Sequence, residues 1–126
     1  MTSLSAGNII YDILANDTAV KAIVTKVFPV VTDKAELPYV AYRREHLTHN
    51  AAKNRRGADE LVVMVNCYAE TYSDSVELGE AVRAALDYSR GKYGDIEMRS
   101  CTLTDSSETY AEDAYIQQLE FTIRIN

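Results

Sequence analysis

The clearest hydrophobic pattern in the chain lies within residues 60–86, where it predicts a strand that leads directly into a helix. The unbroken apolar run 61–65 is typical of a central strand that is covered on both faces. After a polar turn, apolar side chains recur at helical spacing. Thr71 with Asp74 fits a capping box at the helix start, and Ser73 or Asp74 could be the cap instead. The helix is expected to stop near 88–91, where a glycine could serve as its C-cap.

The remaining apolar positions predict helical structure before this segment and strands on either side of it. The first helix is amphipathic over 4–14, and the residues from an N-cap at 16–18 to Val24 form either a short second helix or a continuation of the first. Pro29 cannot donate to a ladder, so its strand should be an edge strand or be interrupted there. A slip in the apolar phase over 98–101 suggests a bulge. The further strands are predicted at 26–31, 38–45, 96–103 and 115–125.

These elements indicate an α+β fold in one domain, because 126 residues match the usual size of a single domain. Strands 38–46 and 60–70 should form one hairpin, and strands 96–104 and 115–125 another. The expected result is a largely antiparallel sheet of about four to five strands, with an N-terminal helix and one long central helix packed against it. We therefore expect residues 1–126 to form a single folded unit.

Composition narrows the class of protein. The formal net charge is −6, which is unfavourable for general nucleic-acid binding because phosphate contacts rely on Lys and Arg. No apolar run approaches the roughly 20 residues that a membrane span needs, and the N-terminus lacks a signal-peptide pattern, so synthesis in a cytoplasm is expected. Cys67 and Cys101 lie at strand positions and are expected to be buried thiols rather than a disulfide.

No constellation of residues indicates catalysis or a bound cofactor. His46 and His49 are separated by three positions in a strand end or loop, without neighbouring ligands at metal-site spacing. Neither histidine lies near a nucleophile-elbow pattern, and the glycines are scattered rather than gathered into a phosphate-binding loop. The carboxylates cluster in solvated turns, where nothing raises their pKa for acid–base work. We expect neither an enzyme nor a metal or cofactor site.

Two polar segments of opposite charge are the best candidates for an interaction site. A long loop at 47–59 is basic, and an acidic connector at 104–114 follows a later strand. The basic loop is either a solvated tip or a contact with an acidic surface, which would be DNA or the acidic connector of another copy. Such head-to-tail contacts close into a ring when the rotation allows. The candidate residues are Lys53, Arg55, Arg56, Asp105, Glu108, Glu112 and Asp113.

Two further features could contribute to an interface. The last strand, 115–125, alternates strictly, so one face is available for water or a partner, and its edge could also pair across subunits. The chain has nine tyrosines and no tryptophan. Those on strands, Tyr39, Tyr42, Tyr68 and Tyr115, are expected mainly to pack in or beside the core, although tyrosine is also enriched at protein interfaces.

The order of motifs along the whole chain resembles the tail-completion, or tail-terminator, family of phages with long non-contractile tails. The strongest piece is Cys-Tyr-Ala-Glu-Thr-Tyr at 67–72, which departs from the family pattern at Tyr68, where tryptophan is common. The Asn-rich loop is a second departure. The residues that carry the resemblance lie at 16–20, 27–29, 37–42, 56–59, 63–72, 81–86 and 115–123.

The resemblance implies a structural virion protein without catalytic activity. Such a subunit forms a ring, typically a hexamer, that caps the head-proximal end of the tail tube and docks to the head connector, with DNA passing through the lumen. It implies a place in the neck of the virion and no contact with membranes. Two alternatives remain open at this point: a head-completion or connector adaptor of the same neck, and a small-ligand or peptide-binding module, which needs an enclosed apolar pocket.

Overall fold

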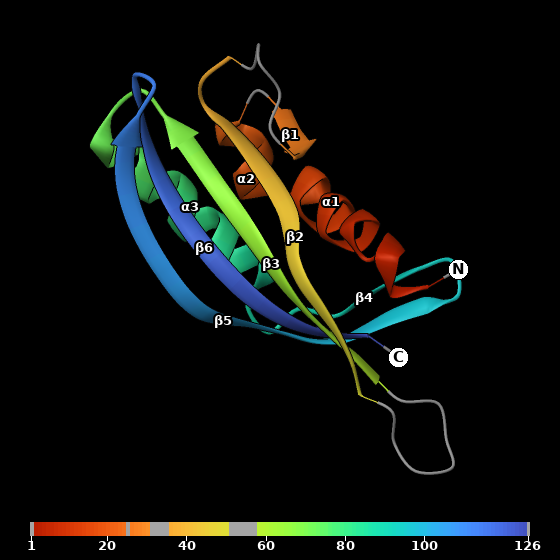
Figure 1. The fold of residues 1–126 in the computed structure, drawn as a ribbon. Helices are drawn as coiled ribbons and strands as arrows, with labels where there is room; N and C mark the ends of the chain where they lie inside the picture. Colours follow the sequence, from red (N-terminus) through yellow and green to blue (C-terminus); the bar gives the residue numbers. More distant parts are fainter. Residues whose placement is uncertain (1, 25, 31–35, 51–57, 126) are drawn as a thin grey trace.

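The computed structural model describes residues 2–24, 26–30, 36–50 and 58–125, and it has the expected α+β class. One sheet carries the strands in the order β1-β2-β3-β6-β5-β4 (Figure 1). Only β1 and β2 are parallel, and every other neighbouring pair is antiparallel. The elements are η1 (Ser3–Ser5), α1 (Gly7–Asn16), α2 (Thr18–Ile23), β1 (Lys26–Pro29), β2 (Tyr39–Asn50), β3 (Ala58–Ala69), α3 (Tyr72–Leu86), β4 (Gly91–Tyr93), β5 (Ile96–Ala111) and β6 (Ala114–Ile125).

Both predicted hairpins are confirmed, as is the edge position of the strand that contains Pro29. The sheet has six strands rather than about five, because β4 covers only three residues and is too short to show a hydrophobic period. The bulge expected over 98–101 is present as a register shift between Met98 and Ser100.

The helix starts follow from their capping residues. The Asp17 carboxylate accepts from the Val20 N–H at 3.1 Å, and the Thr71 hydroxyl accepts from the Asp74 N–H at 3.1 Å, as the capping patterns predict. The predicted end of the long helix was wrong. Helix α3 stops at Leu86, and the chain turns away through Tyr88, whose φ is 64°.

Gly91 is therefore not a helix cap, and a glycine is needed at this position for a different physical reason. A Cβ at Gly91 would lie 2.8 Å from the Cγ2 atom of Ile9 on α1. The close approach of β4 to α1 requires a residue without a side chain at this position.

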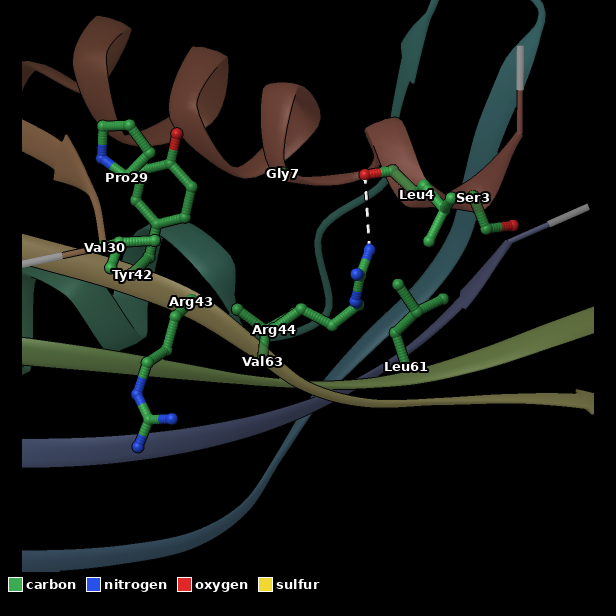
Figure 2. A pocket seen from close by; sticks show the side chains of 10 residues that line it. All are labelled: Ser3, Leu4, Gly7, Pro29, Val30, Tyr42, Arg43, Arg44, Leu61 and Val63. Atoms are coloured by element: carbon green, nitrogen blue, oxygen red, sulfur yellow. Dashed lines mark hydrogen bonds between the residues drawn. The ribbon is translucent and has the colours of Figure 1, made fainter.

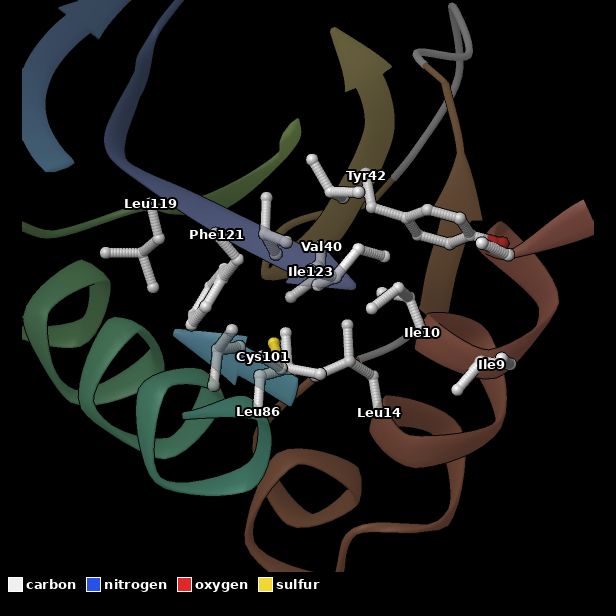
Figure 3. Close-up of a cluster of buried hydrophobic side chains, with 14 of the residues drawn as sticks. Ile9, Ile10, Leu14, Val40, Tyr42, Leu86, Cys101, Leu119, Phe121 and Ile123 are labelled. Atoms are coloured by element: carbon white, nitrogen blue, oxygen red, sulfur yellow. The ribbon is translucent and has the colours of Figure 1, made fainter. Parts of the chain in front are cut away.

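The hydrophobic core lies between one face of the sheet and the helices (Figure 3). Alternate residues of β3 and β6 point to this face, and α1 and α3 supply the opposite layer. Phe121 is among the largest fully buried side chains and lies near the middle of β6. The fully buried core residues of these elements include Ile9, Ile10, Leu14, Val65, Cys67, Leu78, Val82, Leu86, Phe121, Ile123 and Ile125.

The other face of the sheet carries no helix in the described part of the chain, so the expectation that β3 is covered on both faces was wrong. Val62 and Met64 are only half-buried there, whereas Asn66 is 9% exposed. The Oδ1 atom of Asn66 is buried and has no hydrogen-bond partner among the described residues. Among the described residues, this open face is formed by side chains of the strands.

The predicted connector at 104–114 was also wrong. Strand β5 continues to Ala111, and the chain reverses through Glu112 and Asp113 into Ala114. Residues 104–111 are all exposed, so no apolar alternation marks them as a strand in the sequence. In the same way β2 extends to Asn50 and β3 begins at Ala58, which shortens the expected loop at 47–59; residues 51–57 lie outside the described part.

Candidate assembly interface

The four acidic candidates lie together on the outer half of the β5–β6 hairpin. Asp105 and Glu108 belong to β5, while Glu112 and Asp113 form its turn. Asp105 is paired across the strands with Glu120, on the open face of the sheet. Directly opposed carboxylates repel each other, so this pair weakens the isolated hairpin. A cation from a neighbouring molecule would relieve the repulsion.

Glu108 faces the helix side and braces the hairpin against the start of α3. Its carboxylate accepts from the Tyr72 hydroxyl at 3.0 Å and from the Gln117 side-chain amide at 3.0 Å. The same amide donates to the Ser75 hydroxyl at 3.2 Å. The bond to Glu108 raises the pKa of Tyr72, because it favours the protonated phenol. Glu108 therefore has a structural role in addition to its charge.

Aromatic side chains gather at the end of the sheet that carries this hairpin turn. On the helix side, the Tyr115 ring lies edge-on to Tyr72 and Tyr110, with centroid distances of 6.0 Å and 4.8 Å. On the open face, Tyr39 stacks on Tyr68 with centroids 4.4 Å apart. Burial raises the pKa of Tyr39, with smaller contributions from Tyr68 and the Glu112 charge. The expected packing role of the strand tyrosines is confirmed, since Tyr42 is buried and the others are half-buried.

Two backbone edges of the sheet lack a neighbouring strand within the described residues. Strand β4 pairs only with residues 96–98 of β5. The next two backbone groups of β5 that point away from β6 form hydrogen bonds with the turn between α3 and β4. There the Tyr88 N–H donates to the Cys101 carbonyl at 2.7 Å, and the Leu103 N–H donates to the Asp87 carboxylate at 3.0 Å. Residues 104–111 beyond them form what we call the β5 edge.

The second edge belongs to β2. Strand β1 pairs with residues 39–42, and its last ladder bond runs from the Val30 N–H to the Tyr42 carbonyl at 2.7 Å. Val30 has a φ of 60°, a conformation that β-branched residues rarely adopt, and the pairing of β1 with β2 ends there. Residues 43–50 beyond it form the β2 edge.

The basic candidates Lys53, Arg55 and Arg56 lie outside the described residues. They connect β2 to β3, and these strands meet at the end of the sheet opposite the 112–113 turn (Figure 1). The structure thus brings the acidic candidates together and separates them from the strand ends that flank the basic ones.

Sequence reasoning missed Arg43 and Arg44, which begin the β2 edge. Arg43 forms an ion pair with Glu45 at 2.6 Å, and Arg44 donates to the Leu4 carbonyl at 3.4 Å. The edge assignment of the strand containing Pro29 was the available signal, because a short edge strand leaves the rest of its longer neighbour uncovered.

A cavity of about 280 Å³ lies beside the start of the β2 edge (Figure 2). Arg44 reaches across it toward η1, and Pro29, Tyr42 and Leu61 contribute to its lining. Its volume is just below the range of about 300–1,000 Å³ that is usual for small-molecule sites. It is not the deep tyrosine-lined cavity that a ligand-binding module would need.

Three further properties of the described part of the chain bear on its function: metal-binding groups, membrane-spanning helices and side chains with shifted pKa values. Within it, no group of three or more His, Cys, Asp or Glu residues could hold a metal ion, and no helix is long and apolar enough to cross a membrane. His49 pairs with Asp59 at 2.5 Å, and the pKa of Asp59 is lowered by hydrogen bonds from Ser3 and His49. Burial raises the pKa of both free thiols, that of Cys101 to about 12.

Comparison with solved structures supports the fold. A chain in the structure titled virion of native gene transfer agent particle superimposes with a TM-score of 0.84 at 17% sequence identity. The match covers 98% of this chain and 98% of that one. No curated protein matches the sequence.

The family comparison is more specific. The model of the family described as Tail completion protein gp17 matches residues 9–126, from the first helix to the C-terminal residue of the sequence. The matched range includes every strand, the β5–β6 hairpin and both edges described above. The chain therefore belongs to the tail completion protein gp17 family, a family of structural virion proteins.

Proposed function

We propose that this protein is a ring-forming tail terminator, which closes the head-proximal end of a phage tail tube and joins it to the head connector. The observation that carries the proposal is the separation of charge along the sheet. The turn at 112–113 is acidic, whereas the segment with Lys53, Arg55 and Arg56 joins the strands at the opposite end.

This separation favours head-to-tail association over a two-fold dimer. Ala69 pairs with Tyr115 near the acidic turn, and Asp59 pairs with Ile125 at the other end of the same strands. The intervening ladder spans roughly 30–35 Å at about 3.3 Å per residue, so the acidic turn lies far from the strand ends that the basic segment joins. A contact between different surfaces of successive copies generates a ring when the rotation closes. We propose a hexamer.

The proposed role needs no active site. The partners are further copies of the chain, the tail tube protein on one side and the head connector on the other, in the neck of the virion. The net charge of −6 favours passage of DNA through the lumen without specific binding, because a lumen poor in Lys and Arg does not hold phosphate.

The test combines the oligomeric state with the position in the particle. Native mass spectrometry of concentrated protein, alone and with tail tubes, should show a cyclic oligomer, and labelled copies should decorate headless tails. Labelled copies on DNA-filled heads without tails would instead identify a head-completion adaptor. A strict monomer under both conditions would contradict the ring.

A charge variant tests the contact itself. Changing Lys53, Arg55 and Arg56 together to Glu should weaken ring closure, because the reversed segment would then repel the acidic β5–β6 hairpin of the next copy. Reversal of the exposed residues Lys21 and Arg90, which lie on α2 and directly before β4, is the control. Equal assembly of both variants would remove the 53–56 segment from the contact.

A further inference from the structure

We propose that the ring closes by strand addition: the β5 edge of one copy pairs with the β2 edge of the next, so that one sheet continues from subunit to subunit. This inference rests on the proposed ring and adds the surface through which the copies meet. Both segments, 104–111 and 43–50, belong to strands already held in the ladder by β6 and β3, respectively. They therefore offer preformed templates for another strand.

The direction of the backbone groups on the β5 edge follows from the turn. Ala111 and Ala114 flank a two-residue connection, so they form a hydrogen-bonded pair, and alternate residues of β5 direct their backbone groups toward β6. Ser107 and Thr109 are therefore part of the internal ladder. Ser106, Glu108 and Tyr110 direct their N–H and C=O groups away from β6. The Ser106 N–H currently bonds to the Asp105 carboxylate at 2.8 Å.

Charge selects which edges can pair. The β5 edge carries Asp105 and Glu108 and runs into Glu112 and Asp113. The β2 edge carries Arg43 and Arg44 against one acidic residue, Glu45, and runs toward the basic segment. Two β5 edges placed together would oppose carboxylates to carboxylates. A β5 edge beside a β2 edge opposes acid to base, which favours heterologous contacts and therefore closed rings.

The positions of the two edges in the sheet also favour pairing of the β5 edge with the β2 edge of another copy. Arg43 is level with Met64, and Asp105 is level with Met64 through Glu120, so both edges start in the same row of the sheet. From that row, the β5 edge runs to the end with the acidic turn and the β2 edge runs to the opposite end. Pairing them shifts successive copies by about six residues, or ~20 Å, along the strands. Strands β5 and β2 run in opposite directions within one copy, so their pairing between copies that face the same way is antiparallel.

The β2 edge also has room for an incoming strand. Among the described residues, none pairs with 43–50 on the side away from β3, and the cavity of about 280 Å³ opens beside Tyr42 and Arg43 (Figure 2). Its partly apolar lining can receive a side chain of the added strand.

Cross-linking between variants that each carry one added cysteine tests the proposal directly. Ser107→Cys and Thr48→Cys place thiols on the open face of the two edges, level with Gln118 and Glu60. The native Cys67 and Cys101 are buried and do not compete in the folded protein. A short bifunctional reagent should join Ser107→Cys to Thr48→Cys in mixed samples, and each variant alone should stay un-cross-linked. Cross-linking of Ser107→Cys with itself, or none in a sample that contains rings, would overturn strand addition.

Proline substitutions provide a matched pair at neighbouring exposed positions. Ser106→Pro removes an outward N–H and leaves the internal ladder intact, so the monomer should keep its thermal stability while assembly weakens about tenfold or more. Ser107→Pro removes a bond to β6 and should lower the stability of the monomer itself. Rings of Ser106→Pro as tight as those of the wild type would overturn the proposal.

The two levels of inference fail separately. A wild-type chain that stays monomeric with and without tail tubes contradicts the proposed function. Strand addition alone is contradicted if the wild type forms rings, Ser106→Pro assembles as tightly as the wild type, and Ser107→Cys does not cross-link to Thr48→Cys. If Ser106→Pro does not fold, the cross-linking result decides.

Discussion

The turn at Glu112 and Asp113 is a place where folding and assembly should respond in opposite directions. Both residues have positive φ, 51° and 62°, as a two-residue type I′ hairpin turn requires. This turn type prefers Asn followed by Gly, and side chains other than Gly lose roughly 1–2 kcal/mol in the left-handed region. The present residues are therefore unfavourable for the isolated hairpin.

The double variant Glu112→Asn, Asp113→Gly should stabilise the monomer. Asp113→Gly relieves about 1–2 kcal/mol and Glu112→Asn about 1 kcal/mol, because Asn tolerates the left-handed region better than Glu; the greater freedom of glycine in the unfolded chain offsets about 1 kcal/mol of this. The net gain of about 1–2 kcal/mol corresponds to a rise in Tm of roughly 3–8 °C for a chain of this size. The same variant removes two of the four acidic candidates, so ring formation should weaken.

Thermal and urea unfolding of the monomer, with sedimentation of the assembled protein, measures both effects. Glu112→Gln is the control, because it removes a charge but leaves a side chain in the same conformation, and its Tm should stay within about 2 °C of the wild type. A double variant that is less stable than the wild type would refute the turn assignment. A more stable double variant that assembles as tightly as the wild type would remove this turn from the interface.

Three further predictions concern the core, the long helix and alkaline pH. Phe121→Ala should cost about 3–5 kcal/mol in unfolding free energy because the buried ring leaves a cavity, and Phe121→Leu should cost clearly less in the same urea titration. Thr71→Ala should cost about 1 kcal/mol through loss of the α3 cap, whereas Thr71→Ser should restore most of it. Burial raises the pKa of Cys101 from 9.0 to about 12, so the folded state holds the proton longer than the unfolded state. Stability from this thiol should therefore be complete below pH 9 and be lost between about pH 9 and 12, by up to ~4 kcal/mol. Cys101→Val should make the decline in pH-dependent unfolding shallower without abolishing it, because burial also raises the pKa of Cys67; an unchanged slope would contradict the prediction.

The sequence was most informative where burial of one face makes apolar residues recur at the spacing of a strand or a helix. Strands β3 and β6 and the stripe of α3 were predictable because their core-facing positions are apolar, and the caps at Asp17 and Thr71 fixed two helix starts. The outer half of β5 was missed because its residues are exposed on both sides and only backbone pairing with β6 holds them in a strand. The three residues of β4 were too few to reveal a pattern.

The candidate site was predictable in composition but not in shape. Acidic residues at 105–113 stood out from the sequence, yet only the hairpin geometry shows that Glu108 braces α3 while Asp105 lies on the open face. The β2 edge depends on where β1 ends, and the left-handed Val30 that ends it leaves no signature in a hydrophobic pattern. Backbone edges are a property of topology, so the sequence alone could only suggest them.

The central claim, that copies meet head to tail through opposite charges, can be tested with two complementary variants. In the first, Lys53, Arg55 and Arg56 become Glu, so both ends of the subunit are acidic. In the second, Asp105, Glu112 and Asp113 become Lys, so both ends are basic. Native mass spectrometry of each variant alone should show monomers, and an equimolar mixture should show rings in which the two variants alternate. Rings formed by either variant alone, or a mixture that stays monomeric while the wild type assembles, would contradict the account.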